Sequence, residues 1–227
     1  QEPWLAAVLR FTAWQASLST LLSVGLAVPV ALALARRPRF PGRAVLLRAM
    51  ELSLVLPTLI GLFGLVAVHG RRGWAAPLWE WLVGAESGYL YGLSGIVLAH
   101  VFYNLPLSAR LMLQSLETAP AAHWRLASQL GLTRTTLWRT LEWPRLKPLL
   151  PRLSALVFTL CFTSFAIVMT LGGGPRSSTL EVALYQALKF DHDLALAALL
   201  ALTQLVICLS LWLLALSRGG TPSLMVG

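Results

Sequence analysis

Residues 11–35 read FTAWQASLSTLLSVGLAVPVALALA, which is 25 consecutive positions without a charged side chain. An α-helix rises about 1.5 Å per residue, so this run is about 37 Å long as a helix. The hydrocarbon core of a bilayer is about 30 Å thick. The run therefore predicts a membrane-spanning helix with enough length to tilt.

Four further apolar runs follow along the chain. They are Leu52–Val68 (which needs Ala49 and Met50 to reach across), Leu93–Leu113, Leu153–Leu171 and Leu194–Ser217. Pro57 falls within the first of these, and proline is tolerated in membrane helices because neighbouring groups satisfy the freed backbone. Together the five runs predict an all-α polytopic membrane helical bundle.

The composition agrees with a membrane protein. Of the 227 residues, 57% are hydrophobic and only 12% are charged, whereas about 25% are charged in a typical soluble domain. The formal charge of +9 does not indicate nucleic-acid binding, because the basic residues gather between apolar runs instead of along a solvated face. The expected surroundings are a lipid bilayer.

The basic residues also predict an orientation. Thirteen of the 18 Lys and Arg residues lie between the first and second runs, at the end of the third run or between the third and fourth, or after the fifth. Because short cytoplasmic loops carry the excess of Lys and Arg, these segments are expected inside the cell. The amino end of the sequence is then periplasmic and the carboxyl end cytoplasmic.

Titratable groups do not converge inside the predicted spans. Glu51, Glu117 and Glu142 fall near span ends or in the longest inner loop, and no Asp or Glu lies in the middle of a run. His100 has no second ligand three or four residues away, so no metal site is expected and a hydrogen-bonded packing role is favoured. The pattern disfavours two other classes, a membrane-embedded enzyme and an ion-coupled carrier, and predicts no catalytic residue and no cofactor.

The inner loop 117–151 has an ordered pattern. Pro120 suits the start of a helix and Gly131 the left-handed residue after its end, while Thr133 can cap a second helix that ends at Trp143 before Pro144. Leu126, Ala127 and Leu130 share one face of the first helix, with Arg125 beside it. This pair predicts a docking surface for a protein partner; the alternative is an amphipathic pair lying on anionic headgroups.

These residues resemble the loop signature of permease subunits of binding-protein-dependent ABC importers. That signature reads Glu-Ala-Ala, three residues, Gly, nine residues, then Ile-x-Leu-Pro. This sequence has Arg125-Leu126-Ala127, three residues, Gly131, nine residues, then Leu141-Glu142-Trp143-Pro144. In this sequence Arg125 stands in place of the acid, Leu126 in place of the alanine after it, and Trp143 in place of the final leucine.

The resemblance extends over most of the sequence and is strongest to permeases for thiamine and thiamine pyrophosphate. The similar runs are RFPGR (39–43), HGRRGW (69–74), GIVLAHVFYNLPLSARLMLQSLE (95–117), CFTSFAIVMTLGGGP (161–175) and TLEVALYQAL (179–188). Iron(III) importer permeases share the architecture and are the nearest alternative. The likeness implies a type I ABC importer transmembrane domain over residues 1–218, with 219–227 as a linker or tail.

The resemblance also implies the partners and the mechanism. We expect a cytoplasmic ATP-binding subunit that hydrolyses ATP, a periplasmic substrate-binding protein, a second homologous permease half and a bacterial inner-membrane location. This sequence is then most of an amino-terminal half without its first span. The residues expected to couple to the ATPase are Pro120, Arg125, Leu126, Ala127, Leu130, Gly131, Leu141 and Pro144.

A thiamine substrate implies a neutral, partly aromatic path. Thiamine is a cation with two aromatic rings, and an aromatic side chain attracts a cation by roughly 0.5–2 kcal/mol, weakly enough for release. The candidates for the lining are Tyr103 and Asn104 on the third span and Thr163 and Ser164 on the fourth.

Overall fold

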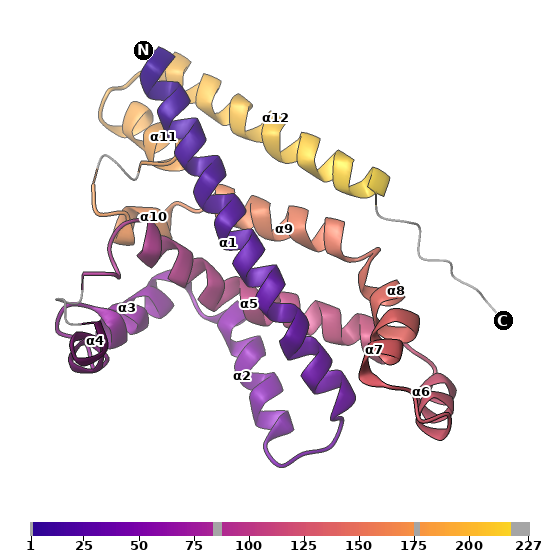
Figure 1. The fold of residues 1–227 in the computed structure, drawn as a ribbon. Coiled ribbons are helices and arrows are strands. Elements are labelled where there is room, and N and C mark those ends of the chain that lie inside the picture. The colour runs from indigo at the N-terminus through magenta and orange to yellow at the C-terminus, as the bar shows by residue number, and fades with distance from the viewer. Residues whose placement is uncertain (1, 84–87, 175–177, 219–227) are drawn as a thin grey trace.

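The structure is a computed structural model that describes residues 2–83, 88–174 and 178–218. Every regular element within those ranges is a helix, as Figure 1 shows, so the predicted all-α fold is confirmed. The predicted tail at 219–227 lies outside the described residues. In chain order the helices are α1 (Glu2–Arg36), α2 (Arg43–Val55), α3 (Thr58–His69), α4 (Ala76–Val83), α5 (Leu93–Glu117), α6 (Ala121–Gln129), α7 (Arg134–Leu137), the π-helix η1 (Trp138–Glu142), α8 (Trp143–Leu146), α9 (Leu150–Phe162), α10 (Ala166–Leu171), α11 (Leu180–Lys189) and α12 (Leu194–Arg218).

Three of the predicted spans form single long helices. Within the described ranges, α1, α5 and α12 are long and apolar enough to cross a membrane. They contain the first, third and fifth predicted runs. Half of the apolar window of α5 is buried in the structure, whereas only 11% of that of α12 is. The helix α5 is therefore central, and α12 lies at the edge of the bundle in Figure 1.

The second predicted span is bent sharply. Instead of one helix over Leu52–Val68, α2 and α3 meet at an angle of 112°. The bend falls at Leu56 and Pro57, and Leu56 has the extended conformation (φ −61°, ψ 125°). Proline disfavours a helical conformation in the residue before it and cannot donate a backbone hydrogen bond. The predicted second span is therefore a bent pair of helices and not one continuous helix.

The fourth predicted span is also interrupted. The run Leu153–Leu171 divides into α9 and α10, and α9 has only 13 residues. Thr163 ends α9 with φ −93° and ψ 14°, and its hydroxyl donates to the Thr159 carbonyl at 2.9 Å. Instead of five continuous spans, the described residues contain three, or up to four if the bent α2–α3 pair counts as one.

The first helix organises the bundle by packing on both α5 and α9, as the ribbon in Figure 1 shows. Its buried face includes a polar stripe beside apolar residues, because Thr12, Gln15, Ser19 and Ser23 recur at helical spacing and are buried. Ser19 Oγ lies 3.0 Å from Nδ1 of the buried His100 on α5. Gln15 Nε2 donates to the Cys161 carbonyl on α9 at 3.0 Å. These bonds join the three helices, and they give His100 the packing role that its sequence context favours.

Candidate functional site

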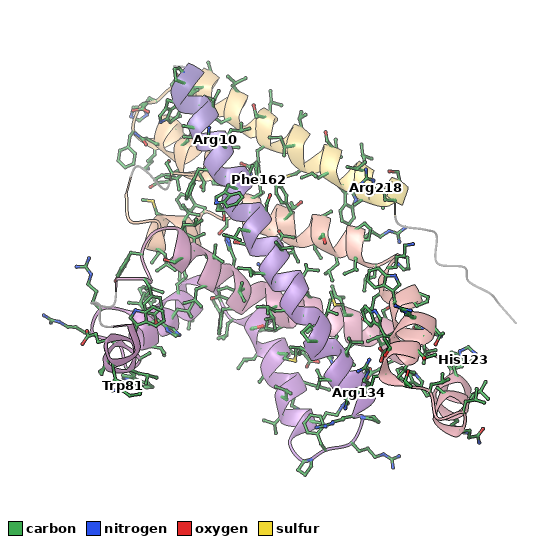
Figure 2. The ribbon with its side chains drawn as sticks, viewed as in Figure 1. Arg10, Trp81, His123, Arg134, Phe162 and Arg218 are labelled. Atoms are coloured by element: carbon green, nitrogen blue, oxygen red, sulfur yellow. The ribbon has the colours of Figure 1, made fainter. Side chains whose placement is uncertain are left out.

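The segment between α5 and α9 protrudes at the end of the bundle where α1 finishes, here called the Arg36 end (Figures 1 and 2). The short helix α6 follows Pro120, as predicted for the start of a helix. Gly131 follows it with φ +60°, the left-handed conformation predicted for this position. Thr133 then caps α7 by accepting a hydrogen bond from the Thr136 backbone N–H at 3.3 Å. Both caps are confirmed, and they fix the turn between α6 and α7.

The helix α6 has two different faces. Leu126 and Leu130 are 54% and 65% exposed, large values for leucine side chains. Trp124 and Ala127 line a cavity against the end of α1, whereas Leu126 and Leu130 do not. The structure therefore separates Leu126 and Leu130 from Ala127, although the sequence places all three near one face. The two leucines form an outward apolar surface, which we call the leucine face.

The chain does not stop being helical at Trp143, so the predicted end of the second loop helix was wrong. Residues 138–142 form the π-helix η1, and the Trp143 N–H donates to the Trp138 carbonyl five residues earlier. Pro144 then sits in the first turn of α8. A proline within a helix crowds the carbonyl four residues before it and removes one bond. The wider π turn immediately before Pro144 accommodates this without ending the helix.

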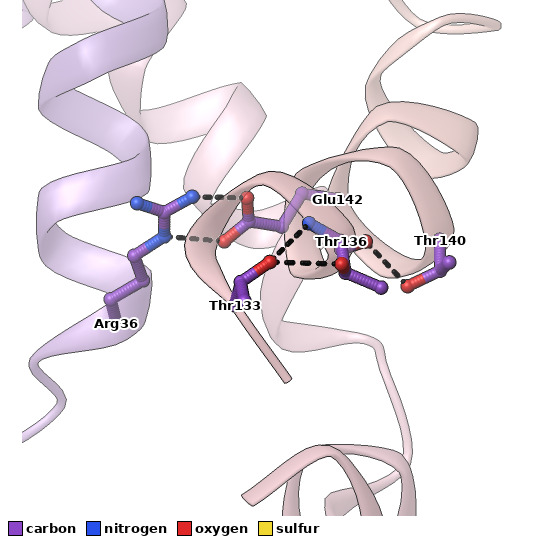
Figure 3. A network of polar contacts seen from close by, with 5 residues as sticks. All are labelled: Arg36, Thr133, Thr136, Thr140 and Glu142. Carbon is purple, nitrogen blue, oxygen red and sulfur yellow. Dashed lines mark hydrogen bonds and ion pairs between the residues drawn. The ribbon is translucent and has the colours of Figure 1, made fainter. Parts of the chain in front are cut away.

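The π-helix brings Glu142 to the end of α1. The Glu142 side chain is fully buried and accepts two hydrogen bonds from Arg36, Nε to Oε1 at 2.7 Å and Nη2 to Oε2 at 2.6 Å (Figure 3). Arg36 is the last residue of α1 and is 27% exposed. A bidentate arginine–carboxylate pair fixes both distance and orientation. The pair therefore joins the loop that carries α6 to the central helix of the bundle.

Sequence reasoning missed this contact. Arg36 and Glu142 are 106 residues apart, and the sequence pattern assigned Glu142 only to the inner loop. The sequence held only a weak signal for this contact. Arg36 is the first charged residue after the 25-residue run, and Glu142 lies between Leu141 and Pro144 of the family-like signature. Leu141 is buried beside it, which is consistent with a segment that packs on the bundle.

Two more ion pairs at the Arg36 end hold α2 on α5. Arg43 Nη2 lies 2.7 Å from Glu117 Oε1, and Arg110 pairs with Glu51. Both carboxylates are about half exposed. Exposed ion pairs contribute at most about 1 kcal/mol to stability. These two pairs therefore stabilise the fold less than the buried Arg36–Glu142 pair does.

The candidate lining residues turn toward different neighbours. Tyr103 on α5 faces α3, where its hydroxyl donates to the Thr58 carbonyl at 3.0 Å. Asn104 is buried on the side of α9, with Nδ2 donating to the His100 carbonyl at 2.9 Å and lying 3.4 Å from Cys161 Sγ. Thr163 and Ser164 lie at the break between α9 and α10 and are partly exposed. The polar break between α9 and α10 lies near α5. The four candidate side chains, however, are not all in contact with one another.

Comparison with known proteins identifies the class. Residues 6–219 match the family described as binding-protein-dependent transport system inner membrane component. This chain belongs to that family, the membrane permeases of binding-protein-dependent importers.

The relatives in this family include thiamine permeases. The chain is 50% identical over 226 residues to the thiamine transport system permease protein ThiP of Salmonella typhimurium, covering 99% of this chain and 42% of the relative. It is 52% identical over 225 residues to ThiP of Escherichia coli K12, covering 98% and 42%. The chain thus spans less than half the length of these relatives. A protein of Zygnema circumcarinatum named "Probable sulfate transport system permease protein cysT" is 30% identical over 203 residues, covering 86% of this chain and 68% of the relative.

Solved importers share the fold. A bacterial ABC transporter for import of the acidic polysaccharide alginate has a TM-score of 0.81 at 14% identity, covering 96% of this chain and 80% of that chain. The MetNI methionine ABC transporter in an inward-facing conformation has a TM-score of 0.72 at 16% identity, covering 96% of both chains. These similarities establish a type I ABC importer transmembrane fold.

Proposed function

We propose that this chain forms membrane-spanning machinery of a thiamine importer, which moves thiamine or its phosphates across the bacterial inner membrane. The observation that carries the proposal is the 50–52% identity to two ThiP permeases over nearly the whole chain. The two structural neighbours support only the fold, because their identities are 14% and 16%.

The leucine face of α6 is the proposed docking site for a cytoplasmic ATP-binding subunit. Leu126 and Leu130 are exposed at the Arg36 end, and burying a leucine side chain contributes about 1.5–3 kcal/mol. In this proposal the left-handed turn at Gly131 sets the direction of α6. Leu141 and Pro144 determine the conformation of the η1–α8 segment that follows α7. ATP binding and hydrolysis in the partner then switch the bundle between inward- and outward-facing packings.

The remaining parts of the proposed importer lie outside this chain. They are a periplasmic substrate-binding protein and a second homologous permease half, with the Arg36 end in the cytoplasm. The concentration of arginines at that end supports the orientation, because cytoplasmic segments carry the basic excess. One related alginate transporter was solved in complex with a pentasaccharide-bound periplasmic protein, and a binding protein is the corresponding proposal here.

The buried charged residues favour a transporter that is driven by a separate ATPase over one that is driven by an ion gradient. Among the described residues, Glu142 is the one buried carboxylate, and Arg36 at the end of α1 neutralises it. An ion-coupled carrier relies on a carboxylate inside its spans, and a membrane enzyme needs several titratable groups that converge. Glu142 serves neither purpose. A permease for iron(III) or another small solute is the closer alternative, and the 30% identity to the CysT protein is a specific reason to test sulfate.

Growth of a thiamine-requiring bacterium tests the substrate. The host lacks its own ThiP, and the complete permease is supplied with residues 1–227 in place of the corresponding host segment. We expect growth on nanomolar thiamine, with no growth from the empty vector. If the protein is inserted normally but restores sulfate-limited growth of a sulfate-permease mutant instead, the thiamine assignment is wrong.

A further inference from the structure

A cavity of about 990 Å³ lies between the end of α1 and the inner face of α6. Three parts of the chain form its walls: the end of α1 with the residues that follow it, the end of α5, and the α6–α7 segment. The lining includes Arg36, Arg37, Arg39, Arg125 and Trp124. Arg125 and Ala127, which belong to the residues expected to couple to the ATPase, line this cavity, but the leucine face proposed to dock the ATPase does not.

The walls of this cavity carry excess positive charge. Four arginines line it against one carboxylate, Glu117. Glu117 pairs with Arg43 and Arg36 pairs with Glu142. No ion pair within the described residues involves Arg37, Arg39 or Arg125. Guanidinium groups match the geometry of phosphate oxygens and bind them with two parallel hydrogen bonds, so the charge and chemistry both favour a phosphate group.

The position of the cavity favours a phosphate that belongs to a lipid. The charge-free run 11–35 ends directly before Arg36, so the cavity lies where α1 leaves the hydrocarbon and meets the headgroups. Trp124, Leu132 and Leu137 supply apolar wall beside the arginines. Basic pockets next to membrane helices are suited to anionic headgroups, and the apolar wall can accept the start of an acyl chain.

We propose that this cavity binds the phosphate of an anionic phospholipid and that the bound headgroup bridges the end of α1 and α6. Arg37 and Arg39 would hold it from the side of α1, and Arg125 from the side of α6. The lipid would limit the movement of α6 relative to α1. The binding step depends on the chain being a membrane permease and not on the identity of its substrate.

The test measures lipid binding to the purified complete permease by native mass spectrometry, with phosphatidylglycerol titrated in detergent. The variant Arg37→Gln/Arg39→Gln removes two charges from the cavity. The variant Arg134→Gln/Arg139→Gln removes two charges from exposed positions in α7 and η1 that do not line it. Because only the first variant loses two guanidinium–phosphate contacts, we expect about thirtyfold weaker phosphatidylglycerol binding in the first variant and less than threefold change in the second.

Five outcomes would overturn the proposal. Equal weakening in both variants would mean a general attraction of basic residues to lipid, and no weakening in either would mean that the cavity is unused. Phosphatidylcholine binding as tightly as phosphatidylglycerol would exclude recognition of an anionic lipid, and full displacement by millimolar inorganic phosphate would identify a free anion as the ligand. Loss of ATPase copurification with lipid binding unchanged would assign the arginines to a protein partner. None of these results depends on whether thiamine is transported.

Discussion

Glu142 carries a carboxylate, a group that is normally solvated, in a fully buried position. Its carboxylate has no exposed surface and depends on two hydrogen bonds from Arg36. Removing one member of a buried ion pair leaves an uncompensated polar group and costs about 3–5 kcal/mol. The partial exposure of Arg36 places this pair toward the lower end of that range.

The substitution Glu142→Gln is therefore expected to destabilise the permease by about 3 kcal/mol. Glu117→Gln is the matched control, because Glu117 also pairs with an arginine but is 52% exposed, and we expect less than about 1 kcal/mol there. Denaturant titration of the purified complete permease in detergent measures both. Equal losses in the two variants would mean that burial of Glu142 has no energetic consequence.

Gly61 gives a second residue-specific prediction. A Cβ atom at Gly61 would lie 1.8 Å from the Tyr103 hydroxyl oxygen, whereas one at Gly64, a turn further along α3, would meet nothing within 4 Å. Gly61→Ala must therefore displace Tyr103 and break its hydrogen bond to Thr58.

We expect Gly61→Ala to lower the unfolding temperature and Gly64→Ala to leave it unchanged or raise it slightly, since alanine favours the helical state by about 1 kcal/mol. Thermal unfolding of the two purified variants provides the comparison. A Gly61→Ala protein as stable as the Gly64→Ala protein would show that α3 and α5 do not pack as described.

The helix α6 carries the proposed coupling to the ATPase through its leucine face. We expect Leu126→Asp/Leu130→Asp to insert into the membrane but lose copurification of the ATPase, because two leucine burials of about 1.5–3 kcal/mol each are lost. Thr135→Asp, an exposed position on α7, is the control for added negative charge. Retained ATPase association with lost binding to anionic bilayers would instead show that the leucine face lies on lipid.

Gly131 tests the direction of the same helix. Its φ of +60° is strained for any β-branched residue, although space around it is open. Left-handed backbone costs about 1–2 kcal/mol in an L-residue with a Cβ atom. We expect Gly131→Val to reduce substrate-stimulated ATP hydrolysis, and Gly131→Asn, which tolerates this conformation better, to retain most of it. Equal activity in both variants would mean that the left-handed turn is not needed for coupling.

Local signals in the sequence predicted some elements well and others poorly. The 25-residue run, the left-handed Gly131 and the Thr133 cap all depend on residues that are adjacent or one helical turn apart, and all three are confirmed. The bend at Pro57 and the break at Thr163 were visible as residue types, but neighbouring helices determine whether a membrane helix tolerates such residues. The Arg36–Glu142 pair joins positions 106 apart, which no local pattern in a single sequence connects.

The arrangement of the bundle combines a polar packing seam with a basic end. Ser19, His100 and Asn104 are buried between α1, α5 and α9, while the ion pairs and the arginine-lined cavity gather at the Arg36 end. The first region holds the helices together, and the second connects them to the segment that carries α6. In the proposed importer, motion of α6 reaches the substrate path through α1 and α5.

Uptake of radiolabelled thiamine by proteoliposomes tests the proposed function of this bundle. The liposomes contain the complete permease with this chain, its ATPase enclosed with ATP on the Arg36 side, and its binding protein on the opposite side. The account predicts thiamine accumulation that requires ATP and the binding protein and that falls to background with Leu126→Asp/Leu130→Asp. Absence of thiamine accumulation by a permease that stays assembled with an active ATPase would contradict it.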